Sequence, residues 1–135
     1  MQEDEKKLID AATTARERAY APYSNFQVGA AVEGESGDIY IGCNVESASY
    51  GLTLCAERVA LVKGISEGRT RFTAVAVVAD TERLTPPCGA CRQLLWEFAP
   101  DATVTLANLK GLTAQFTMRE LLPHGFDRSL LVEKI

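Results

Sequence analysis

The sequence predicts an α/β protein in which helices pack on both faces of a mixed sheet. Segments with apolar residues at helical spacing alternate along the chain with short segments that are alternating or continuously apolar. Two pairs of the short segments are joined by compact polar turns, which are typical of β-hairpins, so the sheet is not purely parallel. The chain has 135 residues, 47% of them hydrophobic, and we expect one domain over residues 1–135.

The first helix and the first hairpin occupy the N-terminal third. The helix is predicted from small or apolar residues at helical spacing and is expected to end at Pro22. Its spaced residues are Leu8, Ala12, Ala15 and Ala19. Segments 26–32 and 39–44 alternate in polarity around the turn 33–38, and together they predict a β-hairpin.

A second helix and a central strand follow. The helix is expected to begin at Cys55, to place Val59 and Val62 on the same face as Cys55, and to end within 64–68. Segment 72–80 is an almost continuous run of alanine and β-branched residues. Such a run is typical of a central strand that is covered on both faces.

The C-terminal third predicts one more helix and a second hairpin. The helix follows Cys88 and ends before Pro100. Its apolar face consists of Cys91, Leu94, Leu95 and Phe98. Segments 103–107 and 112–118 predict the hairpin, after which a short turn at 119–123 and a loose tail close the chain.

Composition and charge argue against two classes of partner, nucleic acid polymers and membranes. The net charge is −4, and an acidic domain lacks the basic surface that binds a nucleic acid polymer. The charged N-terminus has no apolar signal core, and no apolar run approaches the ~20 residues that span a bilayer. We therefore expect a cytoplasmic protein without a membrane partner, in which cysteines stay reduced and serve metal binding or catalysis.

Three of the four cysteines fall where a predicted helix begins. Cys55 opens the second helix, and Cys88 and Cys91 open the third, where backbone amide dipoles favour a thiolate. A Cys-x-x-Cys pair alone also fits a redox pair, a closed structural zinc site that uses Cys43, or ordinary buried thiols. The pair therefore needs a further signal before it indicates a catalytic metal.

That signal is Glu57, two residues after Cys55. Zinc deaminases carry a ligand, any residue and a glutamate, followed downstream by Pro-Cys-x-x-Cys, and the glutamate moves protons without binding the metal. Here the two parts are Cys55–Ala56–Glu57 and the run that begins at Pro87. Three thiolates make the metal electron-rich, so Arg58 is expected to donate hydrogen bonds to the sulfurs, although it could also be a plain surface arginine.

The same residues resemble a known family. The stretches "FQVGAAV", "GCNVESASYGLTLCAERVAL", "PCGACRQLLWEF" and "ELLPHGF" are similar to the small cytidine deaminases, over roughly residues 20–126. The resemblance implies a three-layer α/β/α fold with a five-stranded mixed sheet. It also implies one Zn²⁺ per subunit, held by Cys55, Cys88 and Cys91, a homotetramer whose subunits share active sites, and conversion of cytidine and deoxycytidine to uridine and deoxyuridine in pyrimidine salvage.

The resemblance also implies roles for residues around the metal. Glu57 would carry protons, and Asn44 and Glu46 would hold the ribose of a small nucleoside. The remaining implied substrate contacts are Phe26, Ala48, Tyr50, Ala56 and Phe126, of which Ala48, Tyr50 and Phe126 would reach a neighbouring subunit. Taken singly, Phe26 also fits a core residue, Asn44 a turn residue and Phe126 a core cap. We expect Cys43 to be a buried strand thiol and His124 a polar loop residue.

Three other functions share part of this pattern. A deaminase of a cytosine nucleoside antibiotic such as blasticidin S would carry the same zinc motifs. A deaminase of polynucleotides would share the chemistry, but the acidic composition opposes it. A non-catalytic domain with a structural zinc would have four protein ligands and would leave Glu57 without a role.

Overall fold

The sheet is mixed and five-stranded, as expected. The structure is a computed structural model that describes residues 3–132. Its strand order is β2-β1-β3-β4-β5, and only β3 and β4 pair in parallel. The strands are β1 (Val28–Gly34), β2 (Ile39–Cys43), β3 (Phe72–Ala79), β4 (Thr103–Ala107) and β5 (Thr113–Thr117). The two predicted hairpins and the predicted central strand are therefore confirmed.

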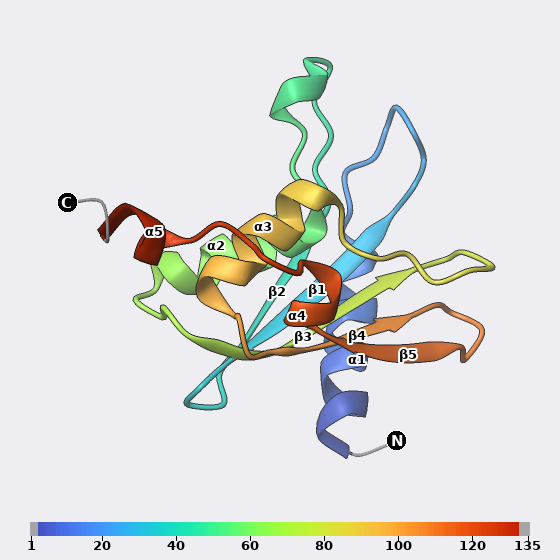
Figure 1. The fold of residues 1–135 in the computed structure, drawn as a ribbon. Helices are drawn as coiled ribbons and strands as arrows, with labels where there is room; N and C mark the ends of the chain where they lie inside the picture. The colour runs from blue at the N-terminus through green and yellow to red at the C-terminus, as the bar shows by residue number, and fades with distance from the viewer. Residues whose placement is uncertain (1–2, 133–135) are drawn as a thin grey trace.

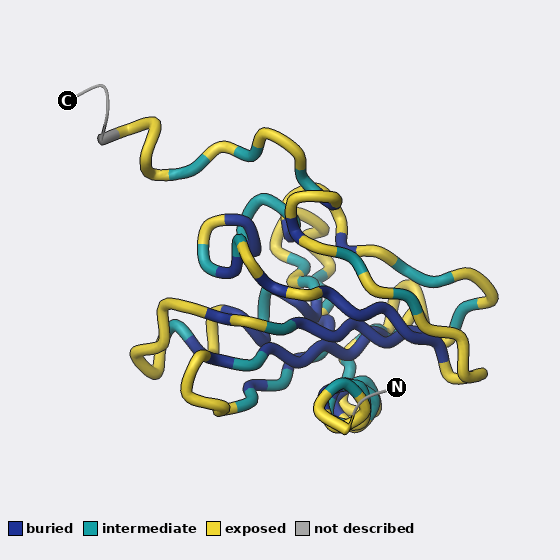
Figure 2. Tube along the Cα trace, turned by 60° about the horizontal axis from the view of Figure 1, so that its bottom comes forward, coloured by how far each residue is buried: buried dark blue, intermediate teal, exposed yellow. Residues whose placement is uncertain are grey.

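Helices cover both faces of the sheet and complete the three layers (Figure 1). The chain forms α1 (Glu3–Arg16), η1 (Tyr50–Leu52), α2 (Ala56–Ser66), α3 (Gly89–Phe98), α4 (Met118–Leu121) and α5 (Arg128–Val132). Helix α1 lies alone against one face, whereas α2, α3 and α4 share the core of the other face. Figure 2 shows α1 nearly end-on beneath the buried strands. Within residues 3–132, no helix is long and apolar enough to span a membrane.

Alternation along the strands separates the two cores. In β1, Ala30 and Val32 pack towards α2 and α3, whereas Ala31 packs towards α1. Two glycines let the helices approach the sheet closely. A Cβ on Gly29 would lie 1.9 Å from a backbone oxygen of α1, and one on Gly42 would lie 2.4 Å from a backbone nitrogen of α2. Gly42, in β2, therefore allows the backbone of α2 to lie close to the sheet.

Helix α1 ends earlier than the sequence predicts. Its last residue is Arg16, so the prediction of an end at Pro22 is wrong. The backbone of Tyr20 bonds instead to the segment after β2: its N–H donates to the carbonyl of Asn44 at 3.0 Å, and its carbonyl accepts from Glu46 at 2.8 Å. These long-range bonds hold the backbone at Tyr20 in an extended pairing with the segment after β2, so the helix does not continue through Ala19.

Two further predictions need correction. The buried face of α2 is not the Cys55–Val59–Val62 stripe, because Gly42 lies under α2 and selects small residues there. The buried residues of that face are Ala56, Glu57, Ala60, Leu61 and Gly64. The tail after the last turn is also not uniformly loose, since it contains α5.

Candidate active site

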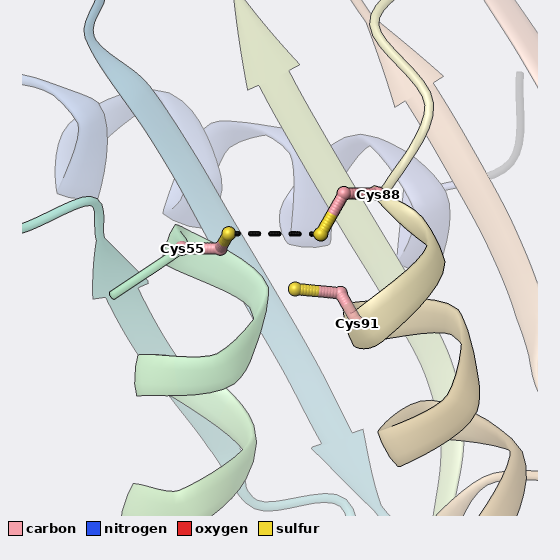
Figure 3. A group of neighbouring side chains, drawn as sticks. All are labelled: Cys55, Cys88 and Cys91. Carbon is pink, nitrogen blue, oxygen red and sulfur yellow. Dashed lines mark hydrogen bonds between the residues drawn. The ribbon is translucent and has the colours of Figure 1, made fainter. Parts of the chain in front are cut away.

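The N-termini of α2 and α3 converge and bring three thiols together. Cys55 is the N-cap of α2, Cys88 is the N-cap of α3, and Cys91 lies in the first turn of α3. Their sulfur atoms all lie within 4.8 Å of one another. Figure 3 shows the three side chains pointing towards a common centre from the two helices.

The spacing of the thiols fits a zinc ion. Zinc–thiolate bonds of about 2.3 Å in tetrahedral geometry place two sulfurs roughly 3.8 Å apart. The Sγ atoms of Cys55 and Cys88 lie 3.8 Å apart. Among residues 3–132 the cluster contains three cysteines, and Cys43 is not one of them, so a closed four-cysteine site is not formed. A tetrahedral ion in this cluster would keep one position open for a non-protein ligand.

The thiols differ in protonation tendency. A hydrogen bond from the Cys91 thiol is the main cause that lowers the pKa of Cys55 to about 6. The Cys88 thiol and the charge of Arg58 act in the same direction, whereas burial opposes them. The pKa of Cys91 is raised, first by its bond to Cys55 and then by burial. The cluster therefore favours a thiolate at Cys55, which is the form that binds a metal.

Glu57 is buried beside the cluster. The residue is only 4% exposed, which is unusual for a glutamate. Burial raises the pKa of Glu57 to about 7, and the nearby Cys55 adds to this shift. Its own backbone amide and Arg58 oppose the shift. A carboxyl group with a pKa near neutrality can both accept and donate a proton, which suits general acid–base chemistry.

Arg58 lies near enough to the thiols for its charge to act on them. The residue is half-buried beside Glu57. No hydrogen bond joins Arg58 to a cysteine sulfur within the described part of the chain. Its positive charge nevertheless lowers the pKa of Cys55, so it favours negative charge on the cluster.

Asn44 fixes the backbone that carries Phe26. Its Oδ1 accepts from the N–H of Val28 at 2.9 Å, and its Nδ2 donates to the carbonyl of Phe26 at 2.7 Å. Phe26 lies just before β1 and is 40% exposed, so it is not an ordinary core residue. Asn44 therefore has a positioning role that the sequence analysis did not foresee.

Glu46 lies at a small open pocket near the surface. Its Oε1 accepts from the backbone amides of Tyr23 and Ser24 at 3.0 and 3.1 Å, and its other oxygen accepts from the Ser24 hydroxyl. These bonds lower the pKa of Glu46, the Ser24 hydroxyl most of all, so the carboxylate is ionised at neutral pH. The pocket encloses about 340 Å³ and is lined by Tyr23, Ser24, Glu46, Ser47, Tyr50 and Thr53.

Several predicted substrate residues are not gathered at the thiols. Residues 45–54 form an arm that projects from the body of the molecule (Figure 1), with Val45 and Leu54 paired at its base. Tyr50, which begins η1 on this arm, is 78% exposed, and Ala48 is also exposed. Phe126 is 54% exposed on the segment after α4. Ala56, by contrast, directly follows Cys55 at the start of α2, and its side chain is fully buried in the core. Cys43 is half-buried rather than buried, and His124 is an exposed loop residue, as expected.

Arg92 supports the site but was not singled out by the sequence analysis. Its Nε donates to the carbonyl of Pro87 at 2.8 Å, and its Nη1 donates to the carbonyl of Leu121 at 2.9 Å. These bonds hold the loop before Cys88 against the end of α4. In the sequence, the feature that could have indicated this role is the position of Arg92 one helical turn after Cys88, which places both residues on the same side of α3.

The chain matches a family model described as "Cytidine and deoxycytidylate deaminase zinc-binding region" over residues 2–107. A cytidine deaminase of Halalkalibacterium halodurans is 56% identical over 124 residues, which cover 91% of this chain and 94% of that protein. The crystal structure of a cytidine deaminase from Burkholderia pseudomallei superposes with a TM-score of 0.88 at 47% identity, covering 93% of this chain and all of that one. A blasticidin-S deaminase of Bacillus cereus is 32% identical over 131 residues, which cover 91% of this chain and 92% of that protein.

Proposed function

The chain belongs to the family of cytidine and deoxycytidylate deaminases, and we propose that it hydrolyses cytidine and deoxycytidine to uridine and deoxyuridine with release of ammonia. The observation that carries this proposal is the buried Glu57 beside three converging thiols. A metal site that lacks a fourth protein ligand and lies next to a proton carrier suits metal-assisted hydrolysis better than structural support.

Cys55, Cys88 and Cys91 would hold one zinc ion per chain. Bound there, zinc supplies Lewis acidity, which lowers the pKa of a water molecule at the open position. The protein must also offset part of the negative charge of the three thiolates, because an electron-rich zinc activates its water less well. The N-termini of α2 and α3 and the Arg58 side chain supply the compensating positive potential.

Glu57 would move the protons of the reaction. Its carboxylate takes a proton from the attacking water and delivers it to N3 of cytosine, which makes C4 electrophilic. After oxygen has added to C4, the same carboxyl carries the hydroxyl proton to the amino group. The C4–N bond then breaks and ammonia leaves, so water and cytidine are converted to uridine and ammonia in balance. The raised pKa of Glu57 fits this exchange, because neither protonation state is strongly disfavoured at neutral pH.

Asn44 and Glu46 are proposed to hold the sugar. An asparagine amide has two donor hydrogens and two acceptor lone pairs, and Asn44 uses one of each kind on the backbone around Phe26. Glu46 can accept about four hydrogen bonds and uses three. Both side chains thus keep capacity for ribose hydroxyls while their present bonds hold them in place.

Neighbouring subunits are proposed to complete the site in a homotetramer. Tyr50 and Phe126 are large and exposed on separate projecting segments, and exposed aromatic residues favour an interface. In this arrangement Ala48 and Tyr50 line a neighbour's site, and Phe126 packs over the base held by another subunit. The enzyme would serve pyrimidine salvage in the cytoplasm.

The direct test is loss of the ultraviolet absorbance of cytidine on incubation with the purified protein. Deoxycytidine and blasticidin S are assayed in parallel, because a blasticidin-S deaminase is also among the relatives. The proposal predicts turnover of both nucleosides and little turnover of the antibiotic. Turnover of blasticidin S alone would replace the proposal with antibiotic inactivation, and turnover of none at one zinc per chain would favour a structural zinc.

A further inference from the structure

The segment that carries Phe126 is held by side chains of α3. We call residues 122–127 the C-terminal strap; it follows α4 and runs past α3 to α5 (Figure 1). The strap contains no helix or strand. Within the described part of the chain, its backbone-to-backbone hydrogen bonds lie only at its two ends, at Leu122 and Asp127. Its course between those ends therefore depends on side-chain contacts.

Two residues of α3 supply these contacts. The Gln93 side-chain amide donates a hydrogen bond to the backbone carbonyl of Phe126. The Trp96 indole donates from Nε1 to Oδ2 of Asp127 at 3.2 Å. The two bonds hold Phe126 and the residue after it, so they restrict the backbone from which the phenyl ring projects.

Packing strengthens the attachment at Trp96. A Cβ on Gly125 would lie 2.7 Å from Cδ1 of Trp96, so the strap touches the indole ring at a residue without a side chain. The guanidinium of Arg119 lies 5.2 Å from the centre of the same ring. Trp96 is only 9% exposed under this cover. The indole is therefore enclosed by the strap and α4 rather than by the main core alone.

The carboxylate of Asp127 is oriented by Ser129 so that one oxygen accepts the hydrogen bond from the indole. Its Oδ1 accepts from the backbone amide of Ser129 at 2.9 Å, which leaves Oδ2 for Trp96. Bonds from the Ser129 side chain and backbone, followed by the weaker one from Trp96, hold the pKa of Asp127 below its usual value. The carboxylate is charged at neutral pH, and a hydrogen bond to a charged acceptor is stronger than one between neutral groups.

This attachment contrasts with the exposure of Phe126. The chain is held at Phe126 and at Asp127, yet the Phe126 side chain is 54% exposed and belongs to neither core cluster. A tail without a role would not need two side chains of α3 to hold its backbone. Holding the backbone is useful if the exposed phenyl ring must contact a ligand or another chain at a defined position.

We propose that Gln93 and Trp96 are positioning residues that hold the strap so that Phe126 closes over the substrate of a neighbouring subunit. The inference rests on the proposed function, in which the neighbour is a second copy of this chain and the substrate is a cytosine nucleoside. Helix α3 would then serve two active sites. Its first turn binds the metal of its own subunit, and its last two turns place an aromatic ring in the site of the neighbour.

Steady-state kinetics with cytidine form the first arm of the test. Gln93→Leu and Asp127→Ala are expected to raise KM roughly tenfold, which corresponds to about 1.4 kcal/mol of lost binding, with kcat and zinc content close to wild type. Phe126→Ala should raise KM at least as much. Asp127→Asn should remain close to wild type, because its amide oxygen still accepts from the indole. Gln115→Leu, the same change at an exposed residue of β5, is the matched control.

A mixed oligomer tests whether the strap acts on a neighbour. Asp127→Ala chains are co-expressed with an excess of Glu57→Gln chains, which have intact straps but lack the proton carrier. The only competent centres then belong to Asp127→Ala subunits, and most of their neighbours supply an intact strap. The proposal predicts a KM near the wild-type value in the purified mixture. A KM that stays elevated would show that the strap serves its own subunit and would overturn the proposal.

The emission of Trp96, the single tryptophan of the chain, reports strap docking without any enzyme assay. Asp127→Ala should shift its emission to longer wavelength, because the indole gains contact with water, whereas Gln115→Leu should not. If wild type fails to turn over cytidine, the proposed function fails, and this arm still tests the attachment. If wild type is active and Phe126→Ala raises KM, but Gln93→Leu and Asp127→Ala leave KM within twofold, only the positioning proposal is overturned.

Discussion

The proposed metal centre and the proposed substrate-facing periphery of this molecule are built in opposite ways. The centre is compact: Cys55, Cys88 and Cys91 lie at the starts of two helices, and Glu57, in the first turn of α2, is 4% exposed. The periphery is dispersed: Tyr50 and the strap that carries Phe126 project from different parts of the chain and are largely exposed.

The difference indicates which parts of the reaction one chain can perform. Metal binding and proton transfer need groups held within a few ångströms, and a single chain supplies them all. Enclosure of a nucleoside needs surfaces on every side, and in the proposed homotetramer neighbouring chains supply some of them. Changes at the centre should therefore reduce kcat or metal content, whereas changes at the periphery should raise KM.

The largest effect is expected at a metal ligand. Cys88→Ser should remove most of the zinc and nearly all activity, and it should lower Tm by roughly 5–10 °C, because metal binding also stabilises the fold. Metal analysis, calorimetry and the absorbance assay measure the three effects. Cys43→Ser is the matched control, since Cys43 lies outside the thiol cluster and should leave zinc in place. Full zinc content in the Cys88 variant would show that the cluster is not the metal site.

Glu57→Gln should separate chemistry from metal binding. The amide cannot carry protons, so kcat should fall by about 10⁴, while zinc content and fold are retained. Glu67→Gln, at the exposed end of the same helix, should leave kcat unchanged. Turnover of the Glu57 variant at the wild-type rate would remove the proton-carrier role, whatever the zinc content.

A smaller effect on kcat is expected at the edge of the centre. Arg58→Gln should retain zinc and lower kcat roughly tenfold, because the positive charge that offsets the three thiolates is lost. The exposed Arg18 offers the same change away from the site, and Arg18→Gln should have no effect. Equal kcat in both variants at equal zinc content would mean that the helix dipoles alone offset the charge of the three thiolates.

The smallest effect is expected at the tip of the projecting arm. Tyr50→Ala should raise KM several-fold and weaken subunit association, with kcat nearly unchanged, because an interface contact is lost while the centre is intact. Sedimentation or gel filtration measures the association. Leu109→Ala removes an exposed apolar side chain from the β4–β5 turn and should change neither property. A fall in kcat without a change in KM or assembly would contradict the division between centre and periphery.

The sequence predicts the centre better than the periphery for a physical reason. Cys55, Cys88 and Cys91 are recognisable because ligand type and position at a helix start are local properties of the chain. The end of α1 was missed because it depends on bonds between Tyr20 and the segment after β2, which no local pattern records. The buried face of α2 was missed for a similar reason, since it is selected by Gly42 of a neighbouring strand.

The strap shows the same limit more clearly. Trp96 and Asp127 are 31 residues apart, and neither lies in a pattern that predicts their contact. Helical spacing predicts that Trp96 lies on a helix, but no periodic pattern in the tail predicts its contact with that helix. Contacts between a helix and an irregular segment have no sequence period, and only the folded chain brings them together.

We propose that zinc at the three thiols, with Glu57 beside it, brings about the hydrolysis of cytidine. The most direct measurement is the rate of cytidine loss as metal-free protein is titrated with zinc. We expect no turnover without metal and a rate that rises in proportion to bound zinc until one ion per chain is reached. Full turnover by the metal-free protein, or a rate independent of zinc occupancy, would show that the reaction does not need zinc at the thiols.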